Sequence, residues 1–201
     1  MTERFLAILS AAALALAAGP AQANWLDRLT AGADSADAAL QVVDETCVAP
    51  MAAGKPPLLP ESPGPDDLAD ETLRARLAYA AQLGGDQPMI RSKNPHVFFA
   101  GPRVDDFCVA IAQGLSDDGA GQPFDAFVSR MSETHAPGRM MITDARRSVI
   151  LTKAGPMAFY RLPARGDLEP ASAIWAVEMN PEGVPASCFD QQAGPVTCGQ
   201  E

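Results

Sequence analysis

The sequence predicts an α+β fold, in which helices from the N-terminal part pack on an antiparallel β-meander of four to five strands in the C-terminal part. Apolar residues recur at helical spacing in the first two thirds of the chain, whereas the last third holds short apolar runs separated by turn residues. Helices followed by a meander are typical of α+β domains. An apolar N-terminal segment and four cysteines add constraints on cellular location and covalent structure.

Residues 1–23 have the layout of a secretory signal peptide. An apolar run over residues 5–18 is followed by a Gly-Pro pair and by the small-x-small pattern that a signal peptidase cleaves. The run is shorter than the roughly 20 residues that span a bilayer. Asn24, and not a cysteine, follows the expected cleavage site, so we expect a soluble product without a lipid anchor and without membrane insertion.

Residues 24–48 are expected to form an N-terminal helix, because leucine, alanine and valine recur every three or four residues along one face. Residues 49–65 contain six prolines, which exclude a helix or a central strand and predict an extended linker. An α+β domain over residues 66–201 follows. Its first helix is expected to be capped by Asp66 or Asp67.

The middle of the chain allows two interpretations. Residues 86–94 are polar and predict a loop, and residues 96–99 predict a strand. Residues 104–115 fit helical spacing, while the apolar run over residues 107–112 fits a strand. A loop over residues 116–122 then precedes a helix that starts at Pro123, with a buried face formed by Phe124, Phe127, Val128 and Met131.

Strand-like runs dominate the last third of the chain. Residues 148–153 and 156–162 predict one hairpin, and residues 173–179 and 184–190 predict another around a strong Asn-Pro-Glu-Gly turn. A fifth strand is expected over residues 139–143. Within residues 173–179, one face is expected to point to the core, and it carries Trp175, Val177 and Met179.

The four cysteines predict two disulfides, because an even number of cysteines in an exported chain is typical of disulfide-linked proteins. Three pairings are possible. A Gly-Pro turn between Cys188 and Cys198 favours that pair, which leaves Cys47 with Cys108. No Cys-x-x-Cys motif is present and both histidines are far from any cysteine in the sequence, so no metal site, redox chemistry or cofactor is expected.

Residues 132–135, Ser-Glu-Thr-His, bring a hydroxyl, a carboxylate and an imidazole close together. Such groups suit a hydrolase in which His135 activates Ser132. His96, at the start of a predicted strand, is a second candidate base. No Gly-x-Ser-x-Gly elbow is present, and a Pro-Gly pair follows His135, so a surface loop is the competing interpretation.

Charged side chains suggest one further candidate site. Arg146 and Arg147, with Arg139 nearby, could bind a carboxylate or phosphate, although paired arginines before a strand are also typical of a solvated sheet edge. Aspartates at positions 117, 118 and 125 lack the alternating spacing of a calcium loop. The net charge of −10 disfavours binding to nucleic acid or to anionic membranes.

The chain resembles small exported proteins of alphaproteobacteria that carry no assigned activity. The shared features are Cys47-Val48 at the end of the first helix, the Ala-Ala-Gln-Leu-Gly segment over residues 80–84, Cys108-Val109 and Trp175. This resemblance implies an exported, disulfide-linked protein.

A local resemblance covers residues 175–188 and the last cysteine. This segment is similar to the strand-turn-strand of TonB C-terminal-type modules, and Gly183, Cys188 and Cys198 match their pattern. The Ser-Ser-Gly that usually follows the cysteine strand of those modules is absent here. The resemblance implies a shared fragment of the fold.

The sequence thus favours an exported, soluble α+β domain that acts as a non-catalytic binding or accessory module of the bacterial envelope, with another envelope protein as its partner. Arginine outnumbers lysine twelve to three, a bias typical of GC-rich bacterial genomes, so we expect a periplasmic or secreted location. Two alternatives stay open. One is a small periplasmic hydrolase that uses His135 or His96 with a nearby serine. The other is a scaffolding protein whose proline-rich linker binds a partner.

Overall fold

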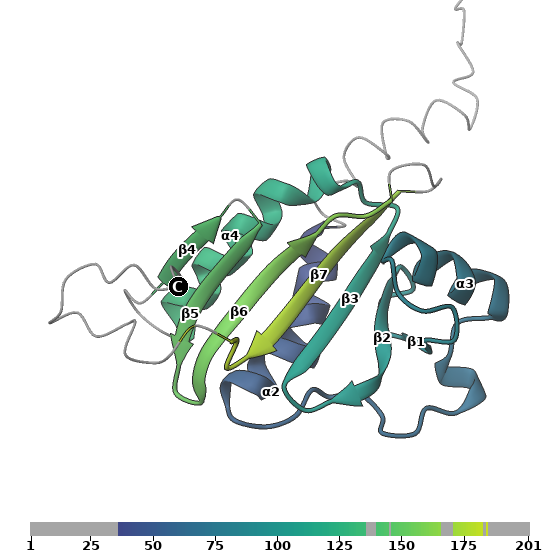
Figure 1. Ribbon diagram of the computed structural model, residues 1–201, viewed down its shortest axis with the longest axis horizontal. Helices are drawn as coiled ribbons and strands as arrows, with labels where there is room; N and C mark the ends of the chain where they lie inside the picture. Colours follow the sequence, from purple (N-terminus) through teal and green to yellow (C-terminus); the bar gives the residue numbers. More distant parts are fainter. Residues whose placement is uncertain (1–35, 136–139, 145, 166–170, 183, 185–201) are drawn as a thin grey trace, which may run out of the picture. The chain divides into compact units, whose positions relative to one another are not determined.

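A seven-stranded antiparallel sheet with the strand order β1-β2-β3-β7-β6-β5-β4 lies at the centre of the fold (Figure 1). The structure is a computed structural model that describes residues 36–135, 140–144, 146–165, 171–182 and 184, and for residues 140–144 it describes the backbone. All of these belong to one compact unit of the chain, residues 32–201. The strands are β1 (Met89–Arg91), β2 (Val97–Val104), β3 (Phe107–Gln113), β4 (Met140–Asp144), β5 (Arg147–Thr152), β6 (Gly155–Leu162) and β7 (Ser172–Met179).

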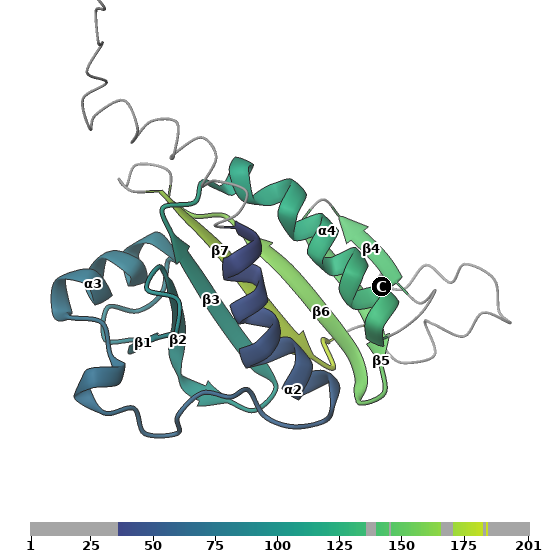
Figure 2. The same cartoon turned by 180° about the vertical axis from the view of Figure 1, so that it is seen from behind.

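Helices cover both faces of this sheet. On one face, α-helical residues 36–43 continue directly into the π-helix η1 (Asp44–Val48) and into α2 (Ala49–Ala52), and α4 (Asp117–His135) lies beside them (Figure 2). On the other face, α3 (Glu71–Ala80) packs at the β1–β3 end of the sheet (Figure 1). The predicted α+β class is confirmed. The sheet has more strands than predicted.

The core follows the alternation of side chains along the central strands. Successive residues of a strand point to opposite faces of the sheet. Trp175 and Val177 of β7 therefore pack beneath α4 and the N-terminal helix, whereas Ile174 and Ala176 pack on the face of α3. The predicted inward direction of Trp175 is confirmed. Both faces of β7 are buried because helices lie on both sides of the sheet.

Strand β3 decides between the two interpretations of the middle segment. The prediction of a helix over residues 104–115 was wrong, and the alternative prediction of a strand over residues 107–112 is confirmed. Cys108 and Ala110 belong to the core on one face, and Val109 and Ile111 belong to the core on the other. A strand buried on both faces has no apolar alternation, so its periodicity is ambiguous. The loop predicted over residues 86–94 contains the short edge strand β1.

Three helix boundaries also differ from the predictions. Helix α4 begins at Asp117, so the predicted loop over residues 116–122 was wrong and Pro123 lies inside the helix, while the predicted buried face is confirmed. The side chain of Asp70, and not that of Asp66 or Asp67, caps α3. Residues 49–52 are helical although Pro50 lies among them. Proline cannot donate to the carbonyl four residues earlier, and here that carbonyl, of Thr46, accepts the N–H of Leu58 instead.

The predicted Cys47–Cys108 disulfide is confirmed, with its Cα atoms 6.2 Å apart. Both cysteines are buried in the core between the sheet and the N-terminal helix, so the bond ties η1 to the central strand β3. The proposed Cys188–Cys198 pair lies outside the described residues.

Strand β7 pairs with β3 on one edge and with β6 on the other. The predicted hairpin between residues 173–179 and 184–190 is therefore contradicted, because neither edge of β7 is free to pair with residues 184–190. Among the described helices, none is long and apolar enough to cross a bilayer.

Candidate functional sites

Two polar clusters lie at opposite ends of α4. The helix has 19 residues, and at 1.5 Å per residue its first and last residues are about 27 Å apart along the axis. Arg146, a predicted anion-binding residue, lies at the N-terminal end, and His135, a predicted base, lies at the C-terminal end. The sequence-predicted residues therefore do not form one common site.

The first cluster consists of Asp117, Arg146 and Arg161. Asp117, the first residue of α4, lies between the two guanidinium groups: its Oδ2 is 2.9 Å from Nη2 of Arg146, and its Oδ1 is 3.6 Å from Nε of Arg161. The side chain of Arg161 is only 19% exposed, and burying a guanidinium group is costly without a partner of opposite charge. The cluster carries one excess positive charge, whereas the chain as a whole is acidic.

A glycine of α4 makes room for the Arg161 side chain. The guanidinium group lies against the helix backbone at Gly121, where an added Cβ atom would collide with Nη1 of Arg161. Arg161 is also the register partner of Trp175 in the neighbouring strand. Strand β6 thus places a charged side chain between α4 and the sheet.

The close approach at Gly121 predicts a non-additive mutational effect. A Gly→Ala change inside a helix usually stabilises a protein by about 1 kcal/mol. When Arg161 is present, we expect Gly121→Ala to bring no such stabilisation, because the added methyl group displaces the guanidinium group of Arg161 from Asp117. In an Arg161→Ala background the full gain should be seen. Urea unfolding of the four proteins measures the difference, and equal effects in both backgrounds would contradict the packing described here.

Arg147 lies on the other face of the sheet from the Arg146–Asp117–Arg161 cluster. Its guanidinium group is 5.3 Å from the ring centre of Tyr160, and the Tyr160 hydroxyl donates a 2.5 Å hydrogen bond to Glu178. Burial and the carboxylate of Glu178 raise the pKa of Tyr160 to about 12. Arg146 and Arg147 are therefore separated by the sheet, and Arg139 lies outside the described residues.

The second cluster consists of Asp44 in η1 with Arg130 and His135 of α4. Asp44 is half-buried, and its Oδ1 atom has no hydrogen-bond partner among the described residues. Burial raises the pKa of this carboxyl group; the positive charges of His135 and Arg130 oppose the rise, and Glu45 adds to it. A π-helical turn and a destabilised carboxylate are both features that occur often at functional sites.

The structure places the predicted catalytic residues in different surroundings. His135 is the last residue of α4 and is half-buried, so it does not lie in a surface loop. Ser132, one helical turn earlier, is 6% exposed and lies on the buried face of α4. His96 is exposed, and its carbonyl accepts a hydrogen bond from Gln113, at the end of the sheet from which the chain enters α4. The two histidines therefore lie near opposite ends of α4.

The raised pKa of Asp44 predicts a pH-dependent effect of Asp44→Asn. A carboxyl group whose pKa is higher in the folded state favours folding when it is protonated, and that contribution is lost as the pH rises through the folded-state pKa. At pH 3 the wild type and Asp44→Asn should have nearly the same stability, because the carboxyl group of Asp44 is protonated and uncharged like the amide. At pH 7 the variant should be more stable than the wild type. Thermal unfolding at both pH values measures this, and Asp37→Asn on the same helix is a control.

Sequence reasoning missed three residues of these clusters, and it considered the fourth, Asp117, only as a calcium ligand. Arg161 carried a signal, because it is a charged residue at an inward position of the apolar run over residues 156–162. Asp44 carried a weaker signal, since it lies next to apolar residues of the helical pattern. Arg130 carried no signal, because basic residues near the C-terminal end of a helix are also favoured by the helix dipole.

Comparison with models of protein families, with curated proteins and with solved structures gives no match to this chain. In the part of the chain that the structure describes, no three histidine, cysteine, aspartate or glutamate side chains are grouped to hold a metal ion. Function is therefore inferred from the contacts of the residues themselves.

Proposed function

We propose that this protein is an exported, non-catalytic binding or accessory module of the bacterial envelope. The observation that carries the proposal is the Cys47–Cys108 disulfide, which joins two core cysteines. Disulfides persist in the periplasm and outside the cell, and they are rare in the cytosol. A buried bond between a helix and a central strand acts as a structural link.

The distribution of reactive side chains supports a role in binding. The hydroxyl of Ser132 is buried on α4, and His96 lies at the far end of that helix from His135. Arg146 and Arg161 lie about 27 Å along α4 from His135, too far to stabilise charge on a group that reacts there.

Export and disulfide formation can be tested together. The full chain is expressed in a Gram-negative host, the cell is fractionated, and the intact mass is measured with and without reductant and alkylating agent. We expect a periplasmic or secreted product that lacks residues 1–23 and whose cysteines react only after reduction. A cytoplasmic product with free thiols would contradict the proposal.

A small periplasmic hydrolase is the second candidate function, and the position of Asp44 near His135 favours it. A carboxylate can orient an imidazole and stabilise its protonated form, as in acyl-transfer enzymes. The test is turnover of peptide, ester and glycan substrates by the wild type, by His135→Ala and by the control His96→Ala. Turnover that is lost only in His135→Ala would establish the hydrolase and exclude the non-catalytic role.

A further inference from the structure

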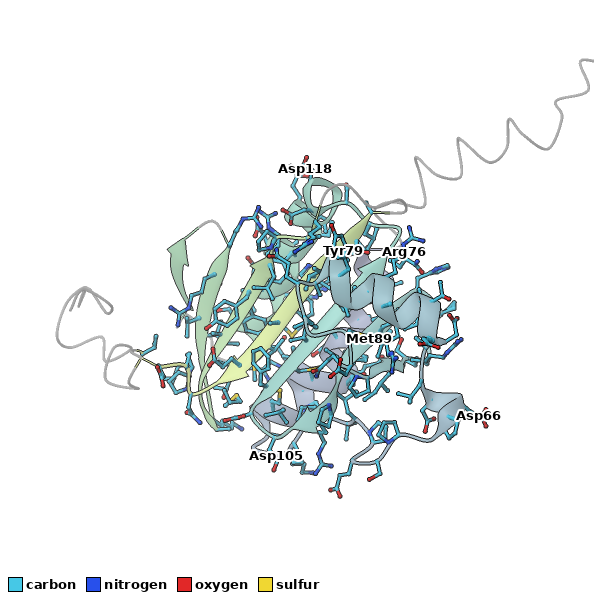
Figure 3. The ribbon with its side chains drawn as sticks, turned by 45° about the vertical axis from the view of Figure 1, so that its right-hand side comes forward. Asp66, Arg76, Tyr79, Met89, Asp105 and Asp118 are labelled. Carbon is cyan, nitrogen blue, oxygen red and sulfur yellow. A yellow bond between two sulfur atoms is a disulfide. The ribbon has the colours of Figure 1, made fainter. Side chains whose placement is uncertain are left out.

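Helix α3 covers only part of its face of the sheet. Its residues Leu77 and Ala78 belong to one core cluster with side chains of β1, β2, β3 and β7. Figure 3 shows this helix, with Arg76 and Tyr79 labelled, over that part of the sheet. Strands β5 and β6 carry a separate cluster on the same face, to which no described helix contributes. We call it the β5–β6 cluster; it comprises Val149, Leu151, Ala158, Tyr160 and Val184.

Two side chains of the β5–β6 cluster are completely buried. Val149 of β5 and Ala158 of β6 are register partners, and both are 0% exposed. Side chains of a strand point away from the plane of the sheet, so their burial requires a further layer above them. Leu151 and Tyr160 come from the same two strands, and Val184 is the member of the cluster that comes from outside them. Val184 is therefore part of a covering layer.

The chain brings Val184 to this position by a turn at the end of β7. The N–H of Asn180, which follows β7, donates a 2.7 Å hydrogen bond to the carbonyl of Pro156 near the start of β6. The side chain of Asn180 lies so close to Gly155 that an added Cβ atom there would collide with its Oδ1. The N–H of Val184 then donates to the carbonyl of Pro181. The turn is thus fixed against the β5–β6 hairpin, and it directs the chain back over the sheet.

Residues 185–201 follow directly and are long enough to continue this layer. An extended chain advances about 3.3 Å per residue, whereas neighbouring strands lie about 4.8 Å apart. Phe189, the fifth residue after Val184, therefore has a reach of about 16 Å, or roughly three strand spacings. Because β3 and β6 occupy both edges of β7, the segment cannot extend the sheet there. The face on which Val184 already lies is within its reach.

Charge and covalent attachment both favour this segment as the occupant of the face. Residues 185–201 carry two acidic side chains, Asp190 and Glu201, and no lysine or arginine. On the sheet, Arg147 lies on the same face, with its guanidinium group 5.3 Å from the ring centre of Tyr160. A second copy of the chain would have to displace Val184, whereas residues 185–201 are attached to it and are present at a high effective concentration.

We propose that residues 185–201 fold back over strands β5, β6 and β7 and complete the cover of this face, with Phe189 packed on the β5–β6 cluster. The occupant of the face is a segment of the same chain. The inference goes beyond the proposed binding role, because it removes this face from the surfaces that a partner protein reaches.

Photo-crosslinking of the full, oxidised protein tests this arrangement. The photoreactive amino acid p-benzoylphenylalanine replaces Leu151, a partly buried member of the cluster, and irradiation is followed by digestion and mass spectrometry. We expect a crosslink within one chain to a peptide from residues 185–201. The same amino acid in place of Leu58, which is 70% exposed and whose N–H is bonded to Thr46 of η1, should give no crosslink to that segment.

Two results of this experiment would overturn the inference. One is a crosslink from position 151 to a second chain, which would show that another copy covers the face. The other is a folded protein, by circular dichroism, in which position 151 forms no crosslink to residues 185–201.

The variant Phe189→Ser provides a second test that leaves the described residues unchanged. Because burial of a phenylalanine side chain stabilises a fold, we expect the equilibrium constant of unfolding in urea to rise by about tenfold or more. Gln192→Ser changes a polar residue of the same segment and should leave this constant unchanged. Equal constants for the two variants would contradict the packing of Phe189. Both variants keep Cys188 and Cys198, so the export and disulfide test has the same expected result whatever these experiments show.

Discussion

Replacing Cys47 and Cys108 by alanine is expected to lower the free energy of unfolding by about 4 kcal/mol. The two cysteines are separated by 61 positions, and a crosslink over such a long loop removes much conformational entropy from the unfolded chain. Single domains are stable by only about 5–15 kcal/mol. Loss of this one bond should therefore remove a large part of the total stability.

Urea unfolding of Cys47→Ala/Cys108→Ala against the oxidised wild type measures this effect. The matched control is Cys188→Ser/Cys198→Ser. We predict that these two cysteines are bonded, and their replacement should lower the free energy of unfolding less, because the chain between them is much shorter and a crosslink there constrains the unfolded state less. Equal midpoints for the wild type and the alanine variant would show that the disulfide does not stabilise the fold.

Trp175→Ala is expected to lower the free energy of unfolding by about 3–5 kcal/mol, the range seen when large aromatic side chains in protein cores are replaced by alanine. Trp175 is 1% exposed and belongs to the main core cluster, between the sheet and the helices on one of its faces. Its neighbours in register are Ala110 on β3 and Arg161 on β6. The side chain of Ala110 is small, and that of Arg161 is held by its ion pair with Asp117. Neither can fill the cavity that alanine would leave.

A second substitution at the same position separates packing from hydrogen bonding. The indole N–H of Trp175 is buried and has no acceptor among the described residues. Trp175→Phe removes this donor and leaves a smaller cavity, so it should cost much less than Trp175→Ala. Denaturation followed by far-UV circular dichroism compares the three proteins. A phenylalanine variant as unstable as the alanine variant would contradict this account.

Helix α4 connects the core to both candidate sites. Its apolar face packs on the sheet through Phe124, Phe127, Val128 and Met131, so its two ends are fixed relative to the strands. The N-terminal end places Asp117 between two arginines, and the C-terminal end faces Asp44 of the π-helix. Helix α4 thus holds two charged clusters about 27 Å apart along its axis.

Local patterns predicted the elements that have one dominant local signal. The strands over residues 148–153, 156–162 and 173–179 were found because apolar, β-branched and aromatic runs end at turn residues. The buried face of α4 was found from its spacing of apolar residues. Strand β3 stayed one of two interpretations because it is apolar on both faces, and the start of α4 was missed because it is rich in glycine and aspartate.

The candidate sites were less predictable than the fold. Ser132, His135, Arg146 and Arg147 attracted attention because reactive residues were adjacent in the sequence. In the structure, Arg146 and Arg147 lie on opposite sides of the sheet, and Ser132 is buried although His135 is close to it. The partners that matter, Asp117 for Arg146 and Asp44 for His135, come from distant parts of the chain.

By itself, the sequence determined the α+β class and supported the expectation of export and a preference for the Cys47–Cys108 pair, since composition, periodicity and cysteine number are properties of the chain that need no long-range contacts. The tertiary structure alone decided that β3 is a central strand between β2 and β7, that helices cover both faces of the sheet, and that charged residues gather at the two ends of α4. The reason is physical: strand pairing and charge clustering depend on which distant segments meet, and that choice is made by the burial of the whole core.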